Sequence, residues 1–238
     1  MENISKDNAT LSRESVDRIS VDMKDSCDIP DIFLTQLSSF INENAIKLIP
    51  KKQEIYDIVN LFLEKNHSED PFLIVNLGEI IRQYQKWNLH LPFIKPYYAV
   101  KCNPNLVILK LLYNLGCNFD CASKNEIAKI INLGESPDAK TSNAPLNDRI
   151  VFANPCKMIS QIKYARAHDV DLVVFDDENE LYKMKMFHSN AKLILRIKTD
   201  DTGSICKFNC KFGADGSLAL QIVNRNRNQF VIVKQKQK

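Results

Sequence analysis

After Asp70, short apolar runs alternate with longer amphipathic segments along most of the remaining chain. Runs rich in Val, Ile, Phe and Tyr favour buried strands, and apolar residues at helical spacing favour helices. Their alternation is typical of βα units joined into a parallel sheet. The predicted strands are Phe72–Leu77, Tyr97–Lys101, Asn118–Cys121, Ile150–Ala153, Leu172–Asp176 and Leu193–Lys198, and the predicted helices are Glu79–Trp87, Asn105–Leu115, Asn125–Asn132, Met158–Ala167 and Asn179–Phe187.

Six strands with intervening helices fit two architectures, a doubly wound sheet or a (β/α)8 barrel, and the strand count does not separate them. A complete barrel takes about 250 residues and eight strands, so a barrel that begins near residue 70 would need chain beyond Lys238. The stretch Ser217–Val233 predicts one more helix and a strand at Phe230–Val233. We expect an α/β domain over residues 70–238, which, if it is a barrel, is incomplete at its C-terminal end.

The residues before Asp70 do not show this alternation of strand-like and helix-like runs. Residues 1–28 are polar and mixed in charge, and we expect this arm to be disordered because it offers little apolar surface to bury. Residues 29–69 contain two segments with apolar residues at helical spacing, Ile32–Ile49 and Glu54–Lys65, which predict an N-terminal helical segment.

Composition excludes several classes of protein. The net charge of the 238 residues is only +3, with much of the excess in the last fourteen, which argues against nucleic-acid binding. No run approaches the roughly 18 consecutive apolar residues of a membrane-spanning helix. The seven cysteines are widely spread, so we expect reduced thiols in a cytoplasmic protein. Zinc ligation by Cys117 with Cys121, or by Cys206 with Cys210, is the less favoured interpretation, and no metal site is predicted.

Four side chains at predicted strand ends could carry chemistry. Lys101 ends a strand, where its amine would face the active-site edge of a barrel and could form a Schiff base with a carbonyl group; a solvated lysine is the alternative. Asp120 ends the next strand and Glu126 begins the helix after it, in a sequence that also predicts a helix-capping box starting at Ser123. Arg196 near a later strand end needs an anionic partner if buried, or else faces outward. Common nucleotide, zinc and hydrolase motifs do not occur in the sequence.

Five segments resemble eukaryotic ornithine decarboxylases in their order and spacing, and the resemblance covers about Phe72 to Gly213. They are Pro96–Asn103, Gly116–Lys124, Phe152–Lys157, Ser160–Ala165 and Leu195–Asp201. It implies a pyridoxal-phosphate barrel of the alanine-racemase-like type, decarboxylation of L-ornithine to putrescine in polyamine biosynthesis, and a cytoplasmic homodimer. It also assigns the Schiff base with pyridoxal 5'-phosphate to Lys101, the lining of the cofactor site to Asp120, Glu126 and Arg196, a dimer contact to Lys211, and the binding of the regulator antizyme to Lys157–Leu181.

Parts of the family pattern have no counterpart before Lys238. These are a histidine that stacks on the cofactor, a glycine-rich phosphate cradle, an acid that pairs with the pyridine nitrogen, a cysteine and an aspartate from the partner subunit, and the C-terminal β domain. Thr141–Asp148 resembles an insertion. We therefore expect negligible decarboxylation by this chain alone. A non-catalytic protein that binds antizyme, like the antizyme inhibitors, and a small single-domain pyridoxal-phosphate carrier are the alternatives.

Overall fold

The computed structural model describes residues 19–21, 47–48, 55–66, 71–134, 146–203, 205 and 213–225. Contacts divide the chain into two compact units, residues 1–82 and 83–238. The division falls within helix α3 (Leu77–His90) rather than near residue 70, where the sequence pattern changes. Lys211, Cys206, Cys210 and the predicted strand Phe230–Val233 lie outside the described residues.

The first unit contains a small parallel sheet with the strand order β2-β1-β3. Its strands are β1 (Ile19–Val21), β2 (Lys47–Leu48) and β3 (Val75–Asn76). Three predictions need correction here: β1 lies in the arm expected to be disordered, β2 lies in a segment expected to be helical, and β3 pairs with β1 rather than with the larger sheet. Strands of two or three residues are too short for an alternation of apolar and polar residues to be recognised in the sequence.

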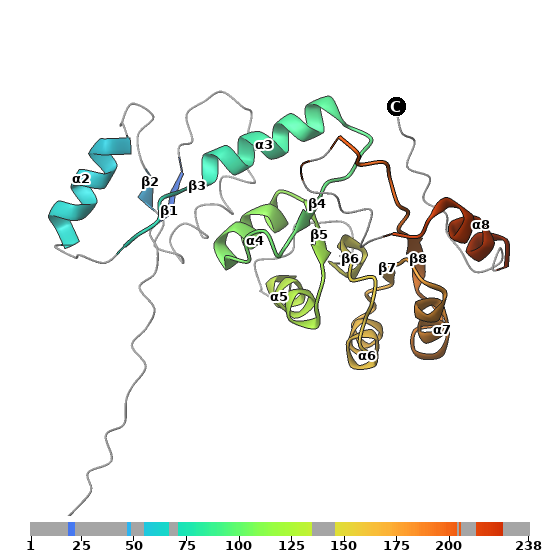
Figure 1. The fold of residues 1–238 in the computed structure, drawn as a ribbon. Helices are drawn as coiled ribbons and strands as arrows, with labels where there is room; N and C mark the ends of the chain where they lie inside the picture. Colours follow the sequence, from blue (N-terminus) through green and yellow to red (C-terminus); the bar gives the residue numbers. More distant parts are fainter. Residues whose placement is uncertain are drawn as a thin grey trace, which may run out of the picture. The chain divides into compact units, whose positions relative to one another are not determined.

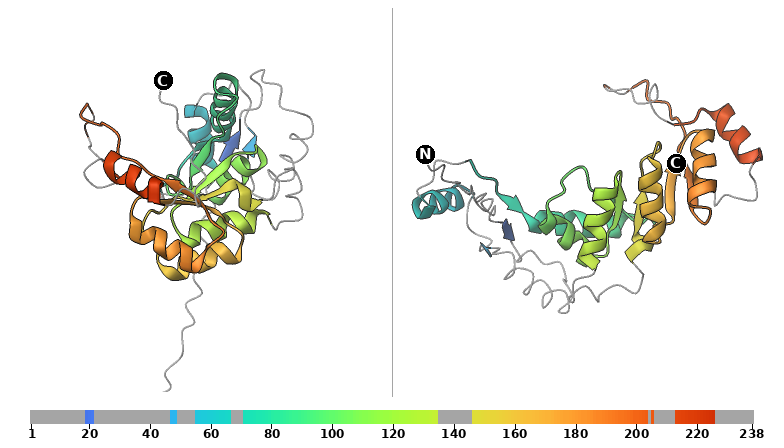
Figure 2. Two further views of the ribbon diagram at one scale, coloured as in Figure 1. Left: turned by 90° about the vertical axis from the view of Figure 1, so that its right-hand side faces the viewer. Right: turned by 90° about the horizontal axis from the view of Figure 1, so that it is seen from below.

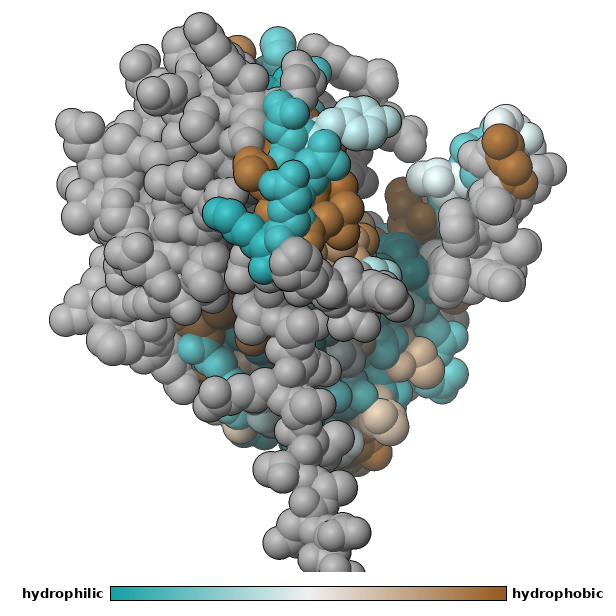
Figure 3. Space-filling model, turned by 90° about the vertical axis from the view of Figure 1, so that its left-hand side faces the viewer, coloured by the Kyte–Doolittle hydropathy of each residue, from teal (hydrophilic) through white to brown (hydrophobic). Residues whose placement is uncertain are grey.

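Helix α2 (Ile55–Asn66) confirms the second predicted amphipathic segment. In Figure 3, which shows the face with α2 in front, hydrophobic and hydrophilic side chains of this helix lie side by side on the surface. Phe62 packs against Phe72 with ring centroids 4.3 Å apart. None of the described helices is long and apolar enough to cross a lipid bilayer.

The second unit is built on a five-stranded parallel sheet with the strand order β4-β5-β6-β7-β8 (Figure 1). All five strands overlap their predicted positions, and β5 has the predicted bounds. The strands are β4 (Tyr97–Ala99), β5 (Asn118–Cys121), β6 (Ile150–Phe152), β7 (Leu172–Phe175) and β8 (Lys192–Leu195). The helices between and after them are α4 (Leu106–Asn114), α5 (Lys124–Gly134), α6 (Ile159–Ala167), α7 (Glu178–Phe187) and α8 (Gly216–Arg225), with a 3₁₀ turn, η1, at Leu146–Arg149.

The strand order separates the two architectures that the strand count left open, and it agrees with the barrel that the family resemblance implied. Each strand pairs with the next one in the chain, whereas a doubly wound sheet reverses its order at a switch point. Right-handed crossovers in an unreversed order place every connecting helix on the same face. Figure 1 shows α4 to α7 on one side of the sheet, and the view from below in Figure 2 shows them in chain order. The described strands therefore form part of a barrel-type α/β fold.

The two faces of the sheet differ in burial. Register and the two-residue period of a strand place Phe119, Ile150, Phe152, Val173 and Phe175 on one face, and all five are fully buried, as expected where helices cover the sheet. On the opposite face, Leu172, Val174 and Ile194 are only half-buried. The hydrophobic core of this unit thus lies between the sheet and helices α4 to α7.

Candidate functional site at the carboxyl rim

The carboxyl ends of β4 to β8 lie along one edge of the sheet because all five strands are parallel; this edge is called the carboxyl rim below. Lys101 follows β4 in a turn closed by the Cys102 N–H, which donates to the Ala99 carbonyl at 2.9 Å. Between them, Val100 is fully buried and its N–H donates to the carbonyl of Asp120 at 3.0 Å. The backbone of the turn is thereby fixed against β5, while the Lys101 side chain is exposed.

Asp120 lies in β5 beside this turn. Burial raises the pKa of its carboxyl group above the ordinary value, the ammonium of Lys101 opposes that rise, and the carboxylate of Glu126 adds to it. The structure therefore brings the three side chains close enough to influence one another. Asp120 Oδ1 is buried and has no hydrogen-bond partner among the described residues. A buried oxygen of this kind costs free energy unless a ligand supplies a donor.

Glu126 serves as a cap of helix α5. Its N–H donates to Ser123 Oγ at 3.3 Å, and its carboxylate accepts a hydrogen bond from the Ala122 N–H at 2.6 Å. The predicted capping box is present in this modified form, since the carboxylate reaches back to Ala122 rather than to Ser123. Helix capping, one of the two interpretations of Glu126, is thus what the structure shows directly.

Arg196 follows β8 and is paired with a residue that the sequence analysis did not single out. Asp176, which follows β7, accepts hydrogen bonds from Arg196 Nε at 3.1 Å and from Arg196 Nη2, and also from the Gly213 N–H at 3.0 Å. Arg196 therefore has an anionic partner, as a partly buried guanidinium requires. Asp176 comes at the carboxyl end of a predicted strand, as Asp120 does. Attention to every acidic side chain at such a strand end would therefore have identified it from the sequence.

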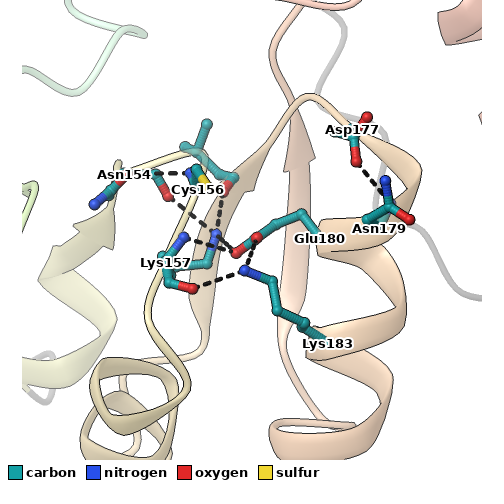
Figure 4. Close-up of polar contacts among 8 residues, drawn as sticks. Asn154, Cys156, Lys157, Asp177, Asn179, Glu180 and Lys183 are labelled. Carbon is teal, nitrogen blue, oxygen red and sulfur yellow. Dashed lines mark hydrogen bonds and ion pairs between the residues drawn. The ribbon is translucent and has the colours of Figure 1, made fainter.

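A second group that sequence reasoning missed lies just below the carboxyl rim (Figure 4). Lys157 in the β6–α6 loop is 2% exposed, and its Nζ lies 2.8 Å from Glu180 Oε1, while Lys183 pairs with the other oxygen of Glu180. Lys157 Nζ also donates to the carbonyls of Asn154 and Val174 at 3.0 and 2.8 Å. Burial lowers the pKa of Lys157, and its hydrogen bond to Glu180 opposes the change. These three side chains are called the buried lysine cluster below.

Four of the cysteines fall within the described residues, and all four are free thiols. Cys117 and Cys121 are buried; burial raises the pKa of Cys117 to about 11 and that of Cys121 still further. Such thiols are unreactive near neutral pH. Within the described part of the chain, no three His, Cys, Asp or Glu side chains gather as a metal site would require.

The residues of the carboxyl rim fit a carbonyl cofactor. An exposed amine at Lys101 can hold a carbonyl carbon, the unpartnered Asp120 Oδ1 can accept a hydrogen bond, and Arg196 adds a positive charge. The unreversed order of the strands is that of a barrel-type α/β protein, and the groups at its carboxyl rim are of the kinds that can bind a carbonyl-bearing ligand.

Similarity to known proteins identifies the family. Residues 77–232 match the family described as pyridoxal-dependent decarboxylase, pyridoxal binding domain. A probable ornithine decarboxylase of Dictyostelium discoideum is 46% identical over 162 residues, covering 68% of this chain and 33% of that protein. Antizyme inhibitor 2 of Xenopus laevis is 36% identical over 201 residues, covering 83% and 42%. The arginine decarboxylase of Paramecium bursaria Chlorella virus has a similar structure, with a TM-score of 0.67 at 30% identity, covering 75% of this chain and 46% of that one.

The chain therefore belongs to the pyridoxal-dependent decarboxylase family, in its pyridoxal-binding domain. The expected fold class and the expected cofactor, pyridoxal phosphate, are confirmed at this level. The chain spans less than half the length of the curated relatives described above.

Proposed function

We propose that this chain supplies the pyridoxal-phosphate-binding part of an ornithine decarboxylase, which converts L-ornithine to putrescine and carbon dioxide. The observation that carries the proposal is that an exposed amine, Lys101, and a carboxylate, Asp120, come from adjacent strands at the carboxyl rim, and that the buried Asp120 Oδ1 has no donor among the described residues. The similarity to ornithine decarboxylases supports the choice of ornithine over other amino acids.

Each residue has a separate part in this proposal. Lys101 holds the carbonyl carbon of pyridoxal phosphate, and Asp120 accepts a hydrogen bond from the bound cofactor or from the cationic substrate. Arg196 places a positive charge beside the cofactor, and Glu126 keeps the β5–α5 turn in place through Ala122. When bound, the cofactor withdraws electrons from the substrate carbon that loses carbon dioxide. The homodimer, the dimer contact at Lys211 and the cytoplasmic location belong to the same proposal.

Labelling at Lys101 tests the cofactor assignment. Incubation with limiting pyridoxal phosphate, borohydride reduction and peptide mapping by mass spectrometry should place most of the label on Lys101, because its amine is exposed and lies beside a carboxylate. Lys101→Arg should reduce the label at this peptide to background, since a guanidinium forms no stable imine.

Two other lysines serve as controls. Lys95→Arg, at an exposed position, should leave the labelling of Lys101 unchanged, and Lys157 should stay unlabelled because its amine is buried. Label spread evenly over the exposed lysines would contradict the assignment. Release of carbon dioxide from labelled ornithine, measured on the same protein, tests the reaction itself.

A second proposed function is binding of antizyme without catalysis, which the similarity to antizyme inhibitor 2 supports. The segment Lys157–Leu181 was expected to form the contact. Helix α6 exposes Lys163 and Arg166 at its surface, beside Phe187 of α7. Lys157, the first residue of this segment, offers no charge to such a contact because its side chain is fully buried against Glu180. The structure corrects this detail.

Charge reversal tests this second function. The double variant Lys163→Glu/Arg166→Glu should weaken binding to purified antizyme by roughly tenfold or more, since like charges then replace complementary ones. The matched control is Lys95→Glu/Lys192→Glu, which changes two exposed lysines elsewhere. Equal weakening by both double variants would show that net charge alone is responsible, and an absence of binding by the unchanged chain would exclude the function.

A further inference from the structure

Asp176, at the carboxyl rim, accepts three hydrogen bonds from described residues on one carboxylate oxygen. Its Oδ2 accepts hydrogen bonds from Arg196 Nε, from Arg196 Nη2 and from the Gly213 N–H. Its side chain is 18% exposed and that of Arg196 is 33% exposed, so water screens the pair only in part. Charge-assisted hydrogen bonds in such surroundings are stronger than those between neutral groups.

The backbone sets these two side chains next to each other. The last residues of β7 and β8, Phe175 and Leu195, are register partners, so Asp176 and Arg196 come directly after adjacent strand ends. The Arg196 N–H donates to the Phe175 carbonyl at 2.8 Å, which continues the ladder by one step. The ion pair therefore lies directly beyond the last backbone hydrogen bond between β7 and β8.

The backbone at Gly213 and Ala214 is hydrogen-bonded to both residues of this ion pair. The Ala214 N–H donates to the Arg196 carbonyl at 2.9 Å, and the Lys198 N–H donates to the Ala214 carbonyl at 2.8 Å. The Gly213 N–H then reaches Asp176 Oδ2. Asp176 consequently restrains Arg196 twice, through the guanidinium and through the segment that borders its backbone.

We infer that Asp176 is a positioning residue: it holds the Arg196 guanidinium in one orientation at the carboxyl rim and sets how much positive charge Arg196 presents to an oxyanion there. Two donors of one guanidinium on one carboxylate oxygen fix which edge of the group faces Asp176, and therefore the direction in which the other edge points. The negative charge of Asp176 also offsets part of the positive charge. The inference rests on the proposed function only in taking that oxyanion to be the phenolic oxygen of pyridoxal phosphate.

The first measurement needs no cofactor. Nitrogen-15 NMR of the chain should show a slowly exchanging Arg196 Nε–H resonance, assigned by its loss in Arg196→Lys. Asp176→Ala should speed its exchange with water at least tenfold, because the acceptor is gone. Asp176→Asn should keep much of the protection, since an amide oxygen still accepts. Unchanged protection in Asp176→Ala would overturn the inference.

The second measurement uses the cofactor bound at Lys101. Its absorbance reports the protonation of the phenolic oxygen, and Asp176→Asn should lower the midpoint pH of that change by roughly one unit, because the negative charge of Asp176 no longer offsets part of the charge of Arg196. The control is Asp171→Asn, which alters a paired carboxylate at the opposite end of β7. A midpoint that does not move in Asp176→Asn would reduce Asp176 to a structural residue and overturn the inference. A wild-type chain that takes no label at Lys101 contradicts the proposed function instead, and the NMR result still decides the orientation of Arg196.

Discussion

Replacing Lys157 by alanine is expected to lower the free energy of unfolding by about 3–5 kcal/mol, the usual cost of leaving one partner of a buried ion pair alone. Glu180, which is 3% exposed in the intact chain, would keep one ammonium, that of Lys183, and the backbone N–H of residue 157. The carbonyls of Asn154 and Val174 would lose their donor as well. Urea denaturation followed by circular dichroism measures the change.

A double-mutant cycle separates the contribution of the Lys157–Glu180 ion pair from that of burying the two side chains. Lys157→Met/Glu180→Leu removes both charges and keeps most of the volume, so it should be considerably more stable than Lys157→Met alone. Lys185→Ala, at an exposed position on the same helix as Glu180, should change stability by less than about 0.5 kcal/mol. A Lys157→Ala variant as stable as Lys185→Ala would show that the buried lysine cluster contributes nothing.

Replacing Gly213 by alanine is the second change with a large expected effect. It should lower the free energy of unfolding by roughly 2–4 kcal/mol. Gly213 has a φ of +87°, which side chains disfavour, and a Cβ there would lie 2.7 Å from the carbonyl carbon of Ile197 and the nitrogen of Lys198. Both contacts are with backbone, which cannot rotate away. Because the Gly213 N–H binds Asp176, we also expect weaker protection of the Arg196 Nε–H in this variant.

Two other glycines serve as matched controls that separate the cost of the positive φ from the cost of the backbone clash. Gly116 has nearly the same φ, +86°, but its Cβ would meet only Tyr84 Oη at 3.6 Å, so Gly116→Ala should cost about 1–2 kcal/mol from conformation alone. Gly216 begins α8 with open space around it, and Gly216→Ala should be neutral or stabilising by up to about 1 kcal/mol. Thermal denaturation should rank the three variants in this order, and equal losses at Gly213 and Gly116 would exclude the backbone clash.

Local patterns in the sequence were enough for the strands and helices of the second unit. Asn118–Cys121 was predicted with the bounds that the structure has, since a short, mostly buried run favours a strand between two others. The same patterns failed for β1 and β2, which are short and are held by pairing with a distant part of the chain. Strands of that length carry no periodic signal of their own.

The candidate site was predictable wherever a side chain follows directly from its place in a strand. Lys101 and Asp120 were expected at one edge of a parallel sheet, and the structure places them there. Lys157 was not expected to be buried, because a lysine in a polar loop is ordinarily solvated. Its burial depends on Glu180, which is 23 residues later in the chain and on another helix.

The sequence by itself determined the alternation of strands and helices, the edge of the sheet at which reactive side chains gather, and the family that this pattern resembles. These follow from residue type and spacing, which act over a few neighbouring residues. The strand pattern left a doubly wound sheet and a barrel open and the family resemblance implied a barrel, but only the tertiary structure shows the strand order itself, because strand order depends on which distant segments pair. It also decided the partners of Arg196 and Lys157, since Asp176 and Glu180 reach them only after the adjacent strands have come together.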